Sequence, residues 1–197
     1  METINSLKPK VSLEAARRRF SADGVRGLFR QLRLGRLRSL AQVYIPFDSF
    51  RVRIERDGTV ETALMALDAV TGTLDPYAFE HLPGEADCVA VRTRNLLPRI
   101  LPPEPSRKNA EERVRRLLYL RGFFRIRTLE ITAELQPLSI YVPYWVGFFG
   151  ADSQLRTAVI DAVRGQTEGA KVRVLLQQWF TGELSPSSNS LHTAAAS

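Results

Sequence analysis

The chain has 197 residues, of which 44% are hydrophobic and 25% charged, with a formal net charge of +7, so it is long enough for one large domain or two small ones with a buried core. No apolar run approaches the roughly 18 residues that cross a bilayer, and the N-terminal residues lack the apolar stretch of a signal peptide. The single cysteine, Cys88, excludes an internal disulfide framework, and together these features lead us to expect a cytoplasmic protein with no transmembrane segment.

The first part of the chain predicts a helix, an extended segment and a hairpin. Ser12 is expected to be the N-cap of a helix in the stretch EAARRRF, and helical spacing continues through residues 25–32 before the chain becomes extended near Leu37. The strands SFRVRIE and VETALMALDAV follow, joined by Asp57-Gly58, a dipeptide that favours a tight hairpin turn. The second strand ends at Asp68-Ala-Val-Thr-Gly72, where the aspartate is expected to accept backbone hydrogen bonds and the glycine can take a positive φ.

The middle of the chain predicts a linker, a second helix and a further strand. The segment NLLPRILPPEPSRKN has four prolines, which indicates a boundary near residue 105. Asn109 and Glu112 have the spacing of a capping box, so a helix is expected to begin there. The residues expected on its buried face are Ala110, Val114, Leu117 and Leu118. Residues 126–135 then alternate as in a half-buried strand, with Leu129, Ile131, Ala133 and Leu135 on one side.

The last part of the chain predicts a second hairpin and a final helix. The strands YWVGFF and LRTAVIDAV are joined through residues 150–153, and the second of them ends at Asp161-Ala-Val-Arg-Gly165. Helical spacing then predicts a last helix that packs on the sheet through Val172, Leu175, Leu176 and Trp179. The tail, residues 181–197, is small and polar and is expected to be disordered.

The two hairpins belong to a longer internal repeat. The matching anchors lie 93 to 97 residues apart in the same order, and they are Tyr44 and Tyr141, Pro46 and Pro143, Asp68 and Asp161, and Gly72 and Gly165; upstream, residues 26–30 match residues 121–125. Matches in one order at a nearly constant offset indicate duplication. We therefore predict an α+β protein made of two diverged copies of a helix plus antiparallel-strand unit, packed as a pseudo-twofold pair around one core. The expected units are residues 1–104 and residues 105–180, followed by the tail.

The segment VRIERDGTVETALMALDAVTGTLD resembles the closing half of a PepSY domain, in which a dipeptide turn joins two strands and the second ends in Asp-Ala-x-Thr-Gly. The second copy, RTAVIDAVRGQ, keeps Asp161 and Gly165 but has Arg164 at the threonine position. The resemblance covers mostly residues 50–75 and 145–166. PepSY domains are mostly extracytoplasmic and are associated with restraining peptidases. The resemblance implies a binding or modulating role and transfers no catalytic residue.

Positive charge is concentrated at matching places in the two copies. Residues 1–40 hold ten basic and three acidic side chains, residues 105–127 hold eight and two, and the remaining segments are acidic. Arginine supplies 24 of the 28 positive charges, and its planar fork suits bidentate contact with phosphate. The candidate anion-binding residues are Arg17, Arg18, Arg19, Arg30, Arg113, Arg115, Arg116 and Arg125. The alternative is a solvated helical face whose arginines pair with acidic neighbours.

Few side chains are suited to catalysis. Only His81 and His192 are histidines, and His192 lies in the predicted tail. Cys88 lies in the apolar run CVAV, which favours a core position. Asp68 and Asp161 are two carboxylates, the residue type that an acid/base pair uses, but their identical turn contexts favour a structural role. The sequence has no phosphate-binding glycine loop and no Gly-x-Ser-x-Gly. We therefore expect no enzyme, no metal site and no cofactor.

The repeated Tyr-x-Pro-aromatic element has two interpretations. Its rings pack in a shared core, or they form an apolar surface for a partner, in which case Trp145, Phe148 and Phe149 are the candidate binding residues. Proline within a strand indicates an edge or a strand start, and an edge accepts an added strand. The sequence thus predicts a non-enzymatic module that binds a protein through sheet edges and aromatic hairpin faces. The alternative is binding of nucleic acid or an anionic membrane surface through the arginine-rich segments.

Overall fold

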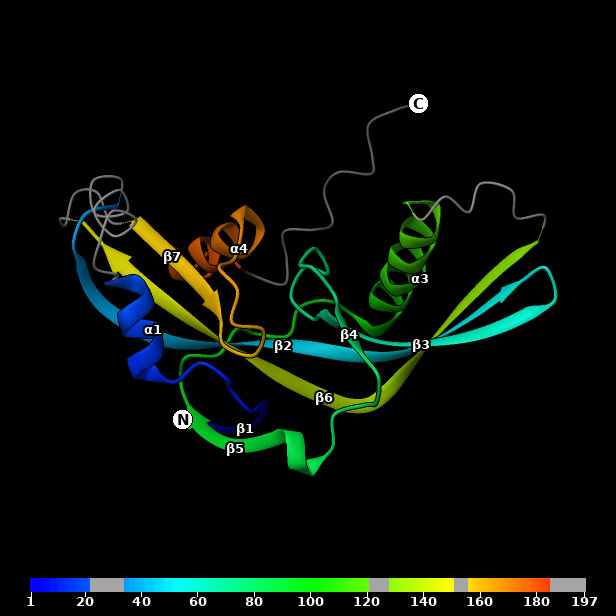
Figure 1. Ribbon diagram of the computed structural model, residues 1–197, viewed down its shortest axis with the longest axis horizontal. Coiled ribbons are helices and arrows are strands. Elements are labelled where there is room, and N and C mark those ends of the chain that lie inside the picture. The colour runs from blue at the N-terminus through cyan, green and yellow to red at the C-terminus, as the bar shows by residue number, and fades with distance from the viewer. Residues whose placement is uncertain (22–33, 121–127, 151–155, 185–197) are drawn as a thin grey trace.

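The computed structural model describes residues 1–21, 34–120, 128–150 and 156–184, and these residues form a mixed α+β architecture (Figure 1). The described helices are α1 (Leu13–Phe20), α3 (Pro103–Leu120) and α4 (Ala170–Phe180), with a short 3-10 turn at Glu85–Asp87. The strands are β1 (Glu2–Leu7), β2 (Leu37–Arg56), β3 (Thr59–Asp68), β4 (Tyr77–Phe79), β5 (Cys88–Thr93), β6 (Leu129–Phe149) and β7 (Arg156–Asp161). They form one seven-stranded sheet in the order β4-β3-β2-β6-β1-β5, and β7 also pairs with β6.

The long strands β2 and β6 are the centre of the sheet. They pair antiparallel over almost their whole length, with Ile45 opposite Val142 and with the flanking tyrosine of each strand opposite the flanking proline of the other. The second half of β2 pairs with β3, and the end of β6, from Tyr144 to Phe149, pairs with β7. In Figure 1, α1 and β7 lie at one end of these two strands, and α3 and β3 lie at the other.

Local signals in the sequence predicted both hairpins correctly. Asp57 and Gly58 have φ values of +46° and +82°, as required in the two-residue turn that suits the twist of β-strands. The antiparallel pairing of β6 and β7 confirms the second hairpin, although loop residues 151–155 lie outside the described residues. Ser12 is confirmed as the N-cap of α1, because its side chain accepts a hydrogen bond from the Ala15 N–H at 3.2 Å.

The predicted start of the second helix is wrong. Helix α3 begins at Pro103, so Asn109 lies within it and the expected boundary near residue 105 falls in its first turn. Proline is compatible with a first helical turn, because the N–H that it lacks would have no intrahelical partner there. The buried face of α3 consists of Ser106, Ala110, Val114 and Leu118, whereas Leu117 is 42% exposed. The upstream matches at residues 26–30 and 121–125 lie outside the described residues.

Strand β6 is one continuous element, where the sequence indicated a strand and a separate hairpin arm. It runs from Leu129 to Phe149, and an irregularity in its pairing with β2 lies between Leu135 and Ser139. Ile131 and Ala133 are buried as expected, but Leu135 beside the irregularity is 39% exposed. The predicted last helix is confirmed as α4. Residues 185–197 of the predicted disordered tail lie outside the described residues.

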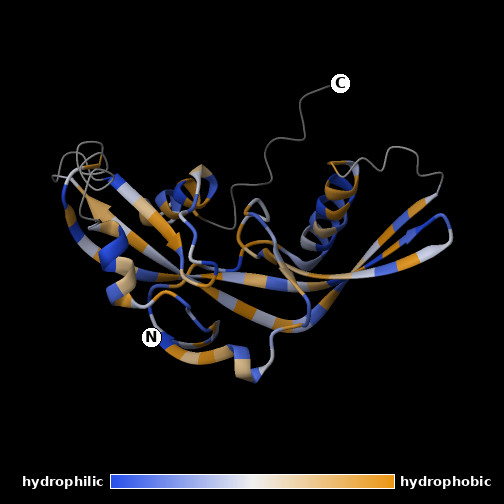
Figure 2. Ribbon diagram, viewed as in Figure 1, coloured by the Kyte–Doolittle hydropathy of each residue, from blue (hydrophilic) through white to orange (hydrophobic). Residues whose placement is uncertain are grey.

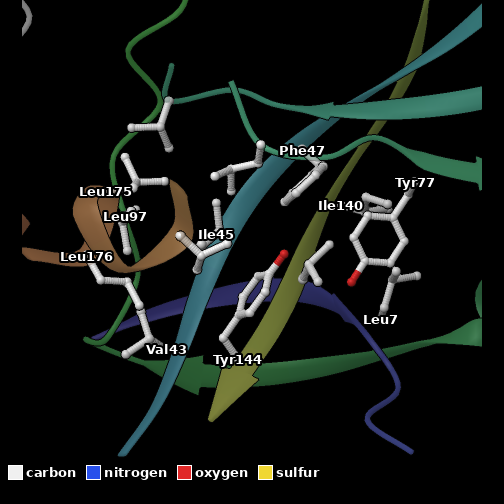
Figure 3. Packing of buried hydrophobic residues seen from close by; sticks show 14 of the residues in the cluster. Leu7, Val43, Ile45, Phe47, Tyr77, Leu97, Ile140, Tyr144, Leu175 and Leu176 are labelled. Carbon is white, nitrogen blue, oxygen red and sulfur yellow. The ribbon is translucent and has the colours of Figure 1, made fainter. Parts of the chain in front are cut away.

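Apolar and polar residues alternate along β2 and β6 (Figure 2), and this alternation leads to three packed clusters. The central cluster takes side chains from all parts of the chain, from Leu7 to Leu176, and α4 packs on it (Figure 3). Helix α3 covers a second cluster on β2, β3 and β6, and α1 covers a third on β6 and β7. The irregularity between Asp48 and Phe50 shifts the alternation of inward-pointing side chains along β2 by one residue. The odd-numbered residues just before it, up to Phe47, therefore point into the central cluster, and the even-numbered residues just after it, from Phe50, point into the α3 cluster.

Candidate functional site

The loop after β3 is organised by the carboxylate of Asp68, which is fully buried. Its Oδ1 accepts hydrogen bonds from the backbone N–H groups of Thr71 (2.7 Å), Gly72 (3.0 Å) and Val70 (3.3 Å), and its Oδ2 accepts one from Leu74 (2.8 Å). Gly72 has φ +70°, a conformation that favours glycine. The predicted role of Asp68 in this turn is confirmed.

The loop after β7 is built in a related way around Asp161, which is also fully buried. Its Oδ1 accepts hydrogen bonds from the N–H groups of Val163 and Arg164, both at 2.8 Å, and Gly165 has φ +71°. Its Oδ2 accepts a hydrogen bond from the hydroxyl of Tyr77 at the start of β4. Asp68 and Asp161 therefore both bind backbone N–H groups, and their carboxylates are occupied by the turns that they hold.

Each aspartate turn is also held by a backbone segment that is distant along the chain. The carbonyl of Ala69 accepts hydrogen bonds from the N–H groups of Ile100 (2.9 Å) and Leu101 (3.0 Å). The carbonyl of Ala162 accepts them from Lys10 (2.8 Å) and Val11 (2.9 Å). These backbone contacts join the segment before each helix to the distant turn.

Each arginine-rich helix uses one arginine for the same purpose. Arg19 of α1 donates to the carbonyl of Gly165 at 2.6 Å. Arg113 of α3 donates to the carbonyls of Gly72 at 3.3 Å and Thr73 at 2.8 Å. These two candidate anion-binding residues therefore stabilise the turns, because their guanidinium groups donate hydrogen bonds to backbone carbonyl groups of the loops.

The other described candidate arginines point to solvent. Arg17 and Arg18 of α1, and Arg115 and Arg116 of α3, are exposed, whereas Arg30 and Arg125 lie outside the described residues. Helices α1 and α3 lie at opposite ends of the molecule in Figure 1. The exposed arginines of these two helices therefore do not form one continuous basic surface.

A polar cluster surrounds the contact between Tyr77 and Asp161. The guanidinium of Arg164 lies 3.6 Å from the centre of the Tyr77 ring, a cation–π contact. Burial, with a smaller contribution from the negative charge of Asp161, raises the pKa of the Tyr77 and Tyr144 hydroxyls, so both remain protonated at neutral pH. Tyr77 therefore acts as a fixed hydrogen-bond donor to Asp161, and the cluster fits a structural role better than proton transfer.

Two carboxylates border this cluster. Burial, with a smaller contribution from Asp161, raises the pKa of Glu168. A hydrogen bond from Lys171 at 2.8 Å lowers the pKa of Asp75. In the part of the chain that the structure describes, no group of three or more His, Cys, Asp and Glu side chains is arranged to hold a metal ion.

The three candidate aromatic residues of β6 separate into two kinds. Trp145 and Phe149 are buried, at 7% and 1% exposed, in the α1 cluster, and the Trp145 indole donates to the carbonyl of Val11 at 2.8 Å. Phe148 is only half-buried. Its ring centre lies 5.5 Å from that of Phe180 at the end of α4. Trp145 and Phe149 therefore match the core interpretation, and Phe148 reaches the surface.

Phe148, Trp179 and Phe180 form what we call the aromatic patch. The rings of Trp179 and Phe180 lie 5.1 Å apart, and Phe180 is 44% exposed. The sequence analysis missed Phe180, although it lies four residues after Leu176, a helical spacing, at the end of the predicted helix. On another flank of α4, an open hollow of about 320 Å³ is lined by Thr71, Thr73, Ala170, Lys171, Val174, Leu175 and Gln178.

The remaining candidates for chemistry are dispersed. His81 is exposed, and His192 lies outside the described residues. Cys88 is buried, and this burial raises the pKa of its thiol. None of the helices in the described residues is long and apolar enough to cross a membrane.

In comparisons with known proteins, no protein-family profile, curated protein or solved structure matched the chain.

Proposed function

We propose that this protein is a non-enzymatic module that binds a partner polypeptide, and that the aromatic patch is its principal contact surface. The observation that carries this proposal is the exposure of Phe180 beside Phe148 and Trp179. Tryptophan and other large aromatic residues at a surface often dominate binding energy, because they bury a large area at a small cost in side-chain entropy.

The charge of α4 indicates the kind of partner. The helix carries Lys171 and Arg173 and no acidic residue. A partner that places aliphatic side chains on the aromatic patch and acidic side chains beside α4 would therefore be complementary in both respects. We propose a polypeptide with apolar residues flanked by aspartate or glutamate as the occupant.

A selection experiment tests this function. Peptides selected from a random display library on the full chain are expected to be enriched in aliphatic and acidic residues. Phe180→Ser should weaken their binding at least about tenfold, because it removes a ring from the centre of the contact. Leu117→Ser, which also removes a large, partly exposed apolar side chain but from α3, is the matched control. Equal affinity of the selected peptides for both variants would refute the aromatic patch as the contact surface.

We also propose that the chain consists of two diverged copies of one unit around a pseudo-twofold axis near Ile45 and Val142. The antiparallel pairing of the two Tyr-x-Pro elements supports this arrangement. The N–H of Ala69 donates to Pro46, and the N–H of Ala162 donates to Pro143, so the two turns bind equivalent carbonyls. The exchange of contacts between each helix and the opposite turn also fits two related units. The hairpins and their aspartate turns are the part of each unit for which we propose a PepSY-like relationship.

Binding of a polyanion remains the second candidate function. The exposure of Arg17, Arg18, Arg115 and Arg116 favours it, because solvated guanidinium groups can bind phosphate or sulfate in bidentate fashion. The separation of α1 and α3 weakens it, since a nucleic acid or membrane surface would contact only one of these helices through a flat interface.

Heparin affinity chromatography tests the second candidate. Replacing Arg115 and Arg116 with glutamine is expected to lower the salt concentration of elution if α3 binds polyanions, because fewer anionic groups are then neutralised and fewer counterions are released on binding. Arg17→Gln with Arg18→Gln is the equivalent change on α1. Arg19 and Arg113 are left unchanged, since they stabilise the turns. The polyanion function is wrong if both double variants elute as the unmodified protein does.

A further inference from the structure

The outer edge of β6 from Leu129 to Leu135 is open. The inner edge of this stretch pairs with β2, while β1 and β7 pair with β6 only farther along, at Tyr141 and at residues 144–149. No strand among the described residues pairs with this outer edge. We call the outer edge of Leu129–Leu135 the open edge.

One backbone group on the open edge has an intramolecular acceptor. The N–H of Ala133 points outward and donates to the carboxylate of Glu111 in α3 at 3.1 Å. Hydrogen-bonding direction alternates along a strand, so the backbone groups of Leu129, Ile131 and Leu135 also point outward. The open edge therefore presents alternate donors and acceptors in the geometry that an added strand needs.

The side chains beside the open edge are acidic on the solvent face. Ile131 and Ala133 are buried under α3, whereas Glu130, Thr132 and Glu134 are exposed. Glu130 lies directly opposite Glu55 of β2, an arrangement of like charges that destabilises a strand pair, whereas Glu134 lies opposite Arg51. Among the ion pairs of the described residues, none involves Glu130 or Glu134.

We propose that the open edge binds an extended segment of a partner polypeptide by strand addition, and that this segment carries lysine or arginine at alternate positions. Basic side chains on the solvent face would lie beside Glu130 and Glu134 and neutralise them. A second copy of this chain fits less well, because antiparallel pairing with full overlap would place Glu130 opposite Glu134 of the copy. This site is separate from the aromatic patch and does not depend on it.

Glu111 competes with the added strand for the Ala133 N–H. A carbonyl of the incoming segment replaces the Glu111 carboxylate, which then returns to water. Removal of this competitor by Glu111→Ala is expected to strengthen binding roughly threefold, since one intramolecular hydrogen bond no longer has to break.

Fluorescence anisotropy with the full chain tests the proposal. The probe is a labelled octapeptide that alternates lysine and valine, and the comparison peptide alternates glutamate and valine. The basic peptide is expected to bind although the protein has a net charge of +7, which disfavours unspecific attraction. Binding should also slow amide hydrogen exchange at Ile131 and Leu135, and a central proline in the peptide should abolish it.

Charge reversal at the open edge separates local from general electrostatics. Glu130→Lys with Glu134→Lys is expected to weaken binding of the basic peptide about tenfold and to favour the acidic peptide. Glu80→Lys with Glu85→Lys makes the same change in net charge at exposed positions elsewhere and should have a much smaller effect. Equal effects of the two double variants, or no binding of the basic peptide, would overturn the proposal. A concentration-dependent dimer that the peptide dissociates would assign the edge to a second copy of the chain instead.

Discussion

Asp68→Ala is expected to lower the free energy of unfolding by about 4 kcal/mol, because it removes the acceptor of several backbone N–H groups in a buried turn. The groups of Val70, Gly72 and Leu74 are in buried residues, where water replaces the lost carboxylate poorly. Urea unfolding followed by circular dichroism measures the change. A fall in the midpoint without a change in slope would show that the loss belongs to the folded state.

Two further variants make this result specific. Asp68→Asn keeps one acceptor oxygen but turns an amide donor toward an N–H group, so an intermediate loss is expected. Asp75→Ala removes a neighbouring aspartate that is exposed and paired with Lys171, and exposed ion pairs contribute at most about 1 kcal/mol. If Asp68→Ala destabilises the protein no more than Asp75→Ala does, the carboxylate does not hold the turn.

Features determined by a few adjacent residues could be predicted from the sequence. The Asp57-Gly58 hairpin, the Ser12 cap and the Asp68 turn all depend on contacts within about six residues. The start of α3 was misjudged because prolines indicate a linker in sequence, although Pro103 and Pro105 fit the first turn of a helix. The alternation that predicted the strand from residue 126 did not show that β6 continues to Phe149, because the irregularity near Leu135 interrupts the pattern.

The contacts of the candidate sites could not be predicted, because they join distant parts of the chain. Tyr77 meets Asp161 across 84 residues, and Arg19 meets Gly165 across 146 residues. Nothing local distinguishes Arg19 from Arg17 or Arg18, and only the packing of α1 decides which arginine reaches the turn. Strand alternation places Trp145 and Phe149 on one face of β6 and Phe148 on the other, but the sequence does not show which helix covers each face.

The contact between Tyr77 and Asp161 joins the two halves of the chain through a single hydroxyl group. Tyr77→Phe is expected to lower the free energy of unfolding by about 2 kcal/mol, because it leaves one oxygen of a buried carboxylate without its donor. The ring stays in place, so the contact with Arg164 and the packing against Phe47 at 5.3 Å should survive. Tyr44→Phe is the matched control, since its hydroxyl donates to Gln42 in a part-buried position and its removal should cost less.

The pH dependence of this variant tests the same hydrogen bond independently. Because burial raises the pKa of Tyr77 above its usual value of 10.0, the unfolded chain loses this proton before the folded protein does. The folded state binds more protons above pH 10, so the stability contributed by Tyr77 is fully present below that pH and falls as the pH rises further. The difference between the unmodified protein and Tyr77→Phe should therefore stay constant from pH 6 to about pH 9 and narrow above pH 10. A difference that changes between pH 6 and pH 9 would mean that another group titrates at this contact.

A double-mutant cycle with Asp161→Asn should give a coupling energy of about 1 kcal/mol or more, and a value near zero would show that the hydroxyl and the carboxylate stabilise the fold separately.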